Sequence, residues 1–149
     1  MSLLLDGGDS LEKFPAGEVL FKEGDLPESF YIVVTGKVTC LKWYNDRLVP
    51  VFTASEKEIV GEDCVLADTN QYFYSAVAME DCEVIRVEKS EVFKFLNTQS
   101  EWIKNILKNI SDKLYHTTDF IAEHKILDNK LLADVDFSDD QEAQLRKKL

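Results

Sequence analysis

The spacing of apolar residues changes once along this chain, and the change divides it into a β-rich part and a helical part. From Phe14 to Val87, short runs of β-branched and aromatic residues are separated by Gly, Pro, Asn and Asp, which favour turns. The expected strands are Glu18–Phe21, Ser29–Val34, Lys37–Tyr44, Arg47–Thr53, Glu58–Val60, Tyr72–Met79 and Glu83–Val87. After Val87 apolar residues recur at spacings of three and four, which is typical of amphipathic helices. This order predicts a mainly β fold with α structure, of the sandwich, barrel or jelly-roll type.

The helical part contains one long expected helix, from about residue 101 to residue 127. Ser100 is a suitable N-cap, and a helix of this length measures roughly 40 Å, more than a compact β-roll needs as cover. Its main apolar seam consists of Ile103, Leu107, Ile110, Leu114, Thr117 and Ile121, and Ile106, Phe120 and Leu127 form a second stripe beside it. We expect one face to cover the domain and the seam to pair with a second copy in a homodimer. The alternative is a helix that packs entirely on its own domain.

The formal net charge of −11 restricts the partners of this chain. Nucleic acids and anionic membranes attract basic proteins, so we expect neither as a direct partner. No apolar run approaches the roughly 20 residues that cross a bilayer, and the first residues do not resemble a secretory signal. The three cysteines are widely spaced without a CxxC pair, which favours small buried side chains over a disulfide framework or a zinc site. These features predict a cytoplasmic protein.

Neither catalysis nor a bound metal or cofactor is expected. The two histidines, His116 and His124, both lie on the expected long helix, whereas a jelly-roll metal oxygenase would need such ligands on its strands. The acidic run that begins at Asp134 fails as a calcium loop, because Asp139 stands where glycine is required and Leu145 where glutamate is required. The sequence therefore predicts a protein that is not an enzyme and has no metal site.

Gly17, Gly24 and Gly36, together with the run Asp81–Val84, carry a resemblance to the cyclic-nucleotide-binding domain family. The glycines stand at the spacing at which that family reverses its strands, in turns where a positive φ is least costly for glycine. The resemblance covers residues 14–127. It implies a double-stranded β-roll, or jelly roll, followed by the long C-terminal helix.

The expected organisation therefore has three parts. Residues 1–13 are an N-terminal tail, and residues 14–127 are the cyclic-nucleotide-binding-like domain, which includes the helix at about 101–127. Residues 128–149 are an acidic tail with a short terminal helix, expected to be solvated or to bind a partner.

Members of that family hold their ligand in a phosphate-binding cassette, and the resemblance implies where this chain would hold one. Gly61 and Glu62 match the start of the cassette, where the backbone approaches a sugar-phosphate and the glutamate accepts hydrogen bonds from a ribose hydroxyl. Asp63 would begin a short helix whose N-terminal amides can face an anion.

The cassette departs from the family at its phosphate-binding arginine. That position falls at Tyr72 when counted back from the following strand and at Gln71 when counted forward from Gly61, and neither residue carries a charge. Phe73 takes the neighbouring position, so that aromatic rings can fill the pocket. A charge-assisted contact to phosphate is worth about 1.5–3 kcal/mol, so its loss weakens binding roughly 10- to 100-fold.

Two threonines on the long helix have two interpretations. Thr117 and Thr118 stand where the family's catabolite activator protein contacts the purine across its dimer, so the resemblance implies a contact with a ligand. The alternative is that Thr117 is a polar seam position that sets the register of the helix pair. Two hypotheses follow. The first is a degenerate receptor that has kept the fold, binds cyclic nucleotide weakly or not at all, and acts as a dimeric adaptor for another signalling protein. The alternative is a genuine sensor of cAMP, cGMP or a cyclic dinucleotide with altered phosphate recognition.

Overall fold

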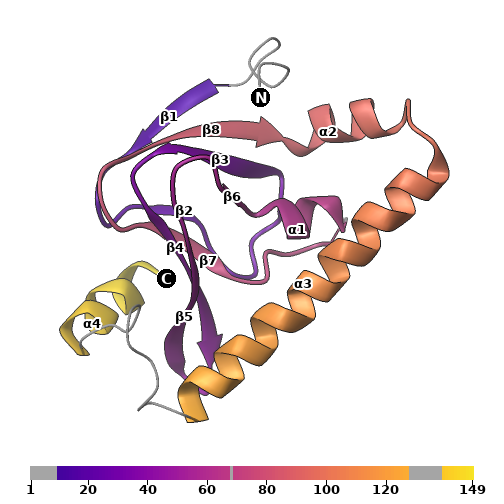
Figure 1. Cartoon of the computed structure of the whole chain (residues 1–149). Helices are drawn as coiled ribbons and strands as arrows, with labels where there is room; N and C mark the ends of the chain where they lie inside the picture. Colours follow the sequence, from indigo (N-terminus) through magenta and orange to yellow (C-terminus); the bar gives the residue numbers. More distant parts are fainter. Residues whose placement is uncertain (1–9, 68, 128–138) are drawn as a thin grey trace.

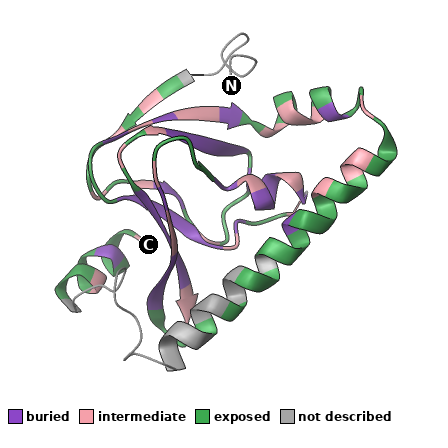
Figure 2. Ribbon diagram, viewed as in Figure 1, coloured by how far each residue is buried: buried purple, intermediate pink, exposed green. Residues whose placement is uncertain are grey.

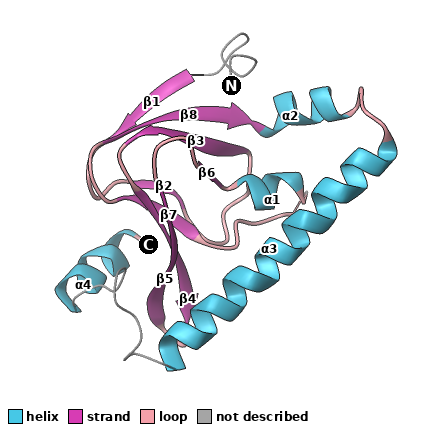
Figure 3. Cartoon of the chain, viewed as in Figure 1, coloured by secondary structure: helices cyan, strands magenta, loops and turns pink. Residues whose placement is uncertain are grey.

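The computed structural model describes residues 10–67, 69–127 and 139–149. In these ranges, eight strands form two four-stranded antiparallel sheets that enclose one core (Figures 1 and 3). Sheet A has the order β1-β8-β3-β6 and sheet B the order β2-β7-β4-β5. The strands are β1 (Ser10–Phe14), β2 (Val19–Phe21), β3 (Ser29–Thr35), β4 (Val38–Tyr44), β5 (Arg47–Ala54), β6 (Ile59–Val60), β7 (Ser75–Ala78) and β8 (Cys82–Glu88). The predicted β-roll is confirmed.

Two strand boundaries correct the expectation from the sequence. Residues 10–13 belong to β1, which pairs with β8 along the edge of sheet A, rather than to an N-terminal tail. Strand β7 begins only at Ser75. The preceding Tyr72 bonds to the backbone of the turn at Gly24 and Asp25 instead of to a neighbouring strand, with N···O distances of 3.0 and 2.8 Å.

Side chains from both sheets meet in the core, where aromatic rings are prominent. Figure 2 shows that buried residues lie in strands of both sheets. Phe21, Tyr31, Tyr72 and Tyr74 are all buried there. The three cysteines are buried and free, as their spacing predicted.

Four helices lie in the described ranges: α1 (Glu62–Leu66), α2 (Lys89–Leu96), α3 (Glu101–Leu127) and α4 (Asp139–Lys148). Helix α3 covers the range expected from the apolar spacing. It lies against α1 and against strands β4 and β5 (Figure 1). Because α1 is the cassette helix, α3 directly contacts the segment that the resemblance assigns to the ligand.

The predicted seam of α3 is divided between two environments. Ile103 and Leu107 are half-buried and share a row with Ser111, which is buried and whose hydroxyl donates to the carbonyl of Leu107. Residues spaced four apart lie on one side of a helix, so this row faces the roll. The exposed members of the helix include Trp102, Ile106, Ile110, Leu114 and Thr117. The side chain of Ile121, the last seam residue, lies outside the described residues.

Helix α4 packs on the outer face of sheet B, which corrects the expectation of a solvated or partner-bound tail. Leu145 is buried against Leu41, Leu48 and Val77. A carboxylate oxygen of Glu142 accepts a hydrogen bond from the backbone N–H of Leu48 at 3.0 Å. The terminal helix is therefore part of the folded domain in its own chain.

Candidate functional site

Gly61 opens the cassette and has a left-handed backbone, with φ of 87°. Glycine adopts this conformation without the strain that a side chain would bring. A Cβ atom here would lie 3.3 Å from the ring of Phe21 and 3.4 Å from that of Tyr72, so the packing also favours glycine. The N–H of Gly61 donates to the hydroxyl of Tyr74 at 2.9 Å. The start of the cassette is thus bonded to the core behind it.

Asp63 turns into the core and is 3% exposed. One carboxylate oxygen accepts from the Tyr74 hydroxyl at 2.7 Å and from the backbone N–H of Cys64 at 3.0 Å. Burial raises the pKa of Asp63, and these hydrogen bonds act in the opposite direction. The Asp63 carboxylate therefore anchors α1, and its bonded oxygen is not presented to a ligand.

Glu62 lies nearer the surface but carries a buried, unsatisfied atom. Among the described residues, its Oε2 atom has no hydrogen-bond partner. Burial, and then the negative charge of Asp63, raise the pKa of Glu62 from 4.5 to about 7. Near neutral pH this carboxyl group is therefore partly protonated and can donate as well as accept a hydrogen bond.

Tyr72 faces inward, whereas Gln71 is exposed, so only Tyr72 of the two candidate arginine positions points into the roll. Its ring is stacked on that of Phe21, with 3.9 Å between the ring centroids. Its hydroxyl donates to the backbone carbonyl of Ser29, and burial raises the pKa of this phenol. Phe73 is half-buried and packs against the same core cluster. The side chain at this position is thus part of the core.

Two cations near the core already have acidic partners. Lys42 is buried, lies 3.6 Å from a carboxylate oxygen of Glu23, and donates to a backbone carbonyl of the cassette at 2.8 Å. Arg86 lies 3.5 Å from Glu12 and 3.2 Å from Glu88. No sequence motif marks either residue. Both are engaged within the fold, so neither replaces the missing phosphate-binding arginine in this structure.

The two threonines of α3 are only partly described. Thr117 is exposed, and its hydroxyl donates to the carbonyl of Lys113 at 2.9 Å, within its own helix. The side chain of Thr118 lies outside the described residues. The expected contact between this pair and a purine remains a prediction.

The cassette combines buried carboxylates with backbone donors and aromatic packing. In the described part of the chain, no group of three or more His, Cys, Asp or Glu residues has the arrangement of a metal site. Nor does any helix in those ranges have the length and apolar character needed to cross a bilayer. Chemically, the side chains of Glu62 and Asp63 repel a phosphate more than they attract it.

Comparison with known proteins agrees with this fold. Residues 11–99 match the family model of the cyclic nucleotide-binding domain. The chain is 26% identical over 125 residues to the anaerobic regulatory protein of Bacillus subtilis. This alignment covers 76% of the present chain and 52% of the Bacillus protein. The chain thus spans about half the length of this curated relative.

Solved structures give the same result. The cAMP-bound form of the EAL enzyme Bd1971 has a TM-score of 0.68 and 22% identity, covering 82% of this chain and 33% of that one. The c-di-GMP-responsive global regulator CLP of Xanthomonas campestris has a TM-score of 0.63 and 18% identity, covering 87% of this chain and 62% of the regulator. At these identities the likeness concerns the fold. Since the family match extends over more than half of the chain, this protein belongs to the cyclic nucleotide-binding domain family.

Proposed function

We propose that this chain is a non-enzymatic signalling module of the cytoplasm whose cyclic-nucleotide site is degenerate, and that it acts as a dimeric adaptor for another signalling protein. The observation that carries the proposal is the aromatic stack of Tyr72 on Phe21. Tyr72 offers no positive charge to a phosphate, and its hydroxyl already donates to Ser29. A nucleotide would therefore lack the contact on which the family relies.

The charges around the cassette support the same proposal. Glu62 and Asp63 are both largely removed from water, and burial raises the pKa of each. A cyclic phosphate would bring a third negative charge close to these carboxyls, and like charges in a poorly solvated site repel strongly. Protonation of Glu62 reduces this repulsion and provides one hydrogen-bond donor, but it supplies no positive charge to the phosphate.

Thermal unfolding of the full chain in the presence of cAMP, cGMP or a cyclic dinucleotide tests whether the chain has lost the ability to bind cyclic nucleotides. We expect no change in unfolding temperature at millimolar nucleotide, with AMP as the control for non-specific effects. A receptor at 100 times its dissociation constant gains about 2.7 kcal/mol, which for a domain of this size raises the unfolding temperature by roughly 5–10 °C. A saturable rise with a cyclic nucleotide, and not with AMP, would overturn the proposal.

The exposed row on α3 supports the proposed dimer. Trp102, Ile106 and Ile110 are spaced four residues apart and are 63%, 46% and 50% exposed. Large apolar side chains grouped on one helix face are typical of protein interfaces. A second copy that presents the same row would bury it symmetrically.

The matched variants Ile110→Glu and Lys108→Glu test this interface, because both add a carboxylate at exposed positions two residues apart. By sedimentation equilibrium we expect the native chain and Lys108→Glu at twice the monomer mass of 17.1 kDa, and Ile110→Glu at the monomer mass. A monomeric native chain would contradict the dimer.

A specific observation favours the alternative, a cyclic-nucleotide sensor with altered phosphate recognition. Gly61 has a left-handed backbone, and within the part of the chain that the structure describes Oε2 of Glu62 lacks a partner, as an acceptor awaiting a ribose hydroxyl would. Similar structures are described in cAMP-bound and c-di-GMP-responsive proteins. The titration above separates the two functions.

A further inference from the structure

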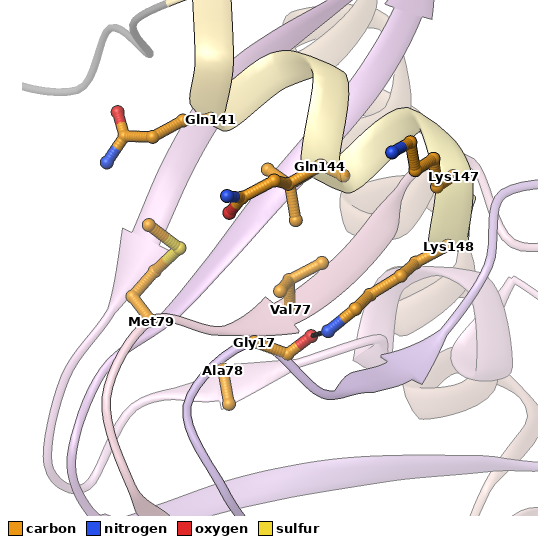
Figure 4. A pocket seen from close by; sticks show the side chains of 9 residues that line it. Gly17, Val77, Ala78, Met79, Gln141, Gln144, Lys147 and Lys148 are labelled. Carbon is orange, nitrogen blue, oxygen red and sulfur yellow. Dashed lines mark hydrogen bonds between the residues drawn. The ribbon is translucent and has the colours of Figure 1, made fainter.

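A hollow lies on the opposite side of sheet B from the core, between that sheet and α4 (Figure 4). Its volume is about 470 Å³, which falls within the roughly 300–1,000 Å³ typical of small-molecule sites. Residues from β7 and the turn after it form one wall, and α4 forms the other. A molecule in this hollow would therefore touch both the roll and the terminal helix.

The wall formed by the sheet is apolar. Val77 is fully buried against Leu145 at its base, whereas Ala78 contributes backbone only, because its side chain points into the core on the other face of the sheet. Met79, at the edge of the hollow, is 39% exposed. Leu145 closes the hollow from the side of α4. This surface suits a hydrocarbon chain, because burying apolar area against it is favourable and leaves no polar group unsatisfied.

The wall formed by α4 carries amide and ammonium groups. Lys148 donates to the carbonyl of Gly17 at 2.7 Å, so its charge is engaged at one end of the hollow. Lys147 also lines the hollow and, among the described residues, has no hydrogen-bond or ion-pair partner. The amide of Gln144 lies on the same wall. In a chain with a net charge of −11, these groups form a local site for an anionic head group.

We propose that this hollow binds a small amphipathic monoanion, namely a medium-chain carboxylate. The alkyl chain lies along the exposed side chain of Met79, above the apolar base that Val77 and Leu145 form, and the carboxylate meets the ammonium group of Lys147. Because the ligand contacts both walls, its binding holds α4 on sheet B. This site is separate from the cassette and does not depend on whether a nucleotide binds there.

The methionine methyl groups provide a direct test, because the chain contains only Met1 and Met79. In the full chain with ¹³C-labelled methionine methyls, Met79→Leu assigns the two NMR signals. We expect sodium decanoate to shift the Met79 signal saturably, decanol to bind more weakly, and acetate to have no effect at the same concentrations. Hydrogen exchange of the α4 amides should slow as decanoate saturates.

Charge variants separate this site from general detergent-like binding. Lys147→Glu should weaken the binding of decanoate roughly five- to tenfold. Lys22→Glu, at an exposed position in the turn after β2 and outside the residues that line the hollow, should leave it unchanged. An unshifted Met79 signal would overturn the proposal. So would equal binding of decanol and decanoate, or equal binding of decanoate to the native chain and Lys147→Glu.

Discussion

The carboxyl group of Glu62 should make the protein less stable as the pH rises, and Glu62→Gln should remove this effect. In the unfolded chain this group titrates near pH 4.5, and in the fold it titrates at about pH 7. Between these values the folded state binds the proton more tightly than the unfolded state does, so stability falls as the pH rises through this window. At about 1.4 kcal/mol for each pKa unit, the full loss above pH 7 is about 3 kcal/mol.

Urea denaturation between pH 5 and pH 8 measures this effect. Glutamine cannot ionise, so the advantage of Glu62→Gln over the native chain should grow by about 2–3 kcal/mol from pH 5 to pH 8. In thermal scans this corresponds to about 5–10 °C. Glu56→Gln, at an exposed position, is the matched control and should show no such growth. A difference between Glu62→Gln and the native chain that stays constant with pH would refute the reasoning.

Other substitutions test further contacts. Gly36→Ala and Gly24→Ala both place a side chain at positive φ, but only Gly36→Ala brings a Cβ within 2.6 Å of a backbone carbonyl oxygen. In urea denaturation, the free energy of unfolding should fall by about 1–2 kcal/mol in Gly24→Ala and clearly more in Gly36→Ala. Equal decreases would contradict the close packing at Gly36. Leu145→Ala removes the buried contact of α4 with sheet B, which is worth about 2 kcal/mol. Because Trp43 packs against the same cluster, its fluorescence emission should shift to longer wavelength when α4 is released; the measurement uses a variant that lacks Trp102. Unchanged emission would argue against the docking of α4. Tyr72→Phe keeps the ring but leaves a buried carbonyl unpaired, so chemical denaturation should show a loss of about 1–2 kcal/mol, and no loss would contradict that hydrogen bond.

Local patterns in the sequence were sufficient to predict a mainly β domain followed by a long helix, and the family resemblance selected the β-roll among the possible β folds. Turn glycines such as Gly17 and Gly36 have positive φ in the structure, as a strand reversal requires. The apolar spacing after Val87 gave helix α3 its bounds, because the helical period is a property of neighbouring residues. These features need no knowledge of distant contacts.

Contacts between distant segments were harder to predict. Strand β1 was missed because Ser10–Phe14 is short and acquires its strand form by pairing with β8. The docking of α4 was missed because the helix is mostly polar and depends on Leu145 meeting sheet B. The burial of Lys42 could have been predicted from its position in β4. Alternate residues of a strand point to the same face, and Lys42 lies two residues after the core residue Cys40, so it points inward.

The candidate site could be predicted only in part, because it too depends on contacts between distant segments. Motif spacing located Gly61 and Glu62, but counting from the two ends of the cassette gave Gln71 or Tyr72 as the substitute for arginine. Only the three-dimensional contacts distinguish them, since Tyr72 stacks on Phe21 while Gln71 is exposed. The shifted pKa of Glu62 likewise depends on burial, which no local pattern reports.

A crystal structure of the full chain grown in millimolar cAMP would test the central claim most directly. We predict that the ring of Tyr72 stays on Phe21, that its hydroxyl stays on the carbonyl of Ser29, and that the cassette contains no nucleotide. Electron density for cAMP at Gly61 and Glu62, with Tyr72 turned away from Phe21 or with a cation on the phosphate, would contradict the claim.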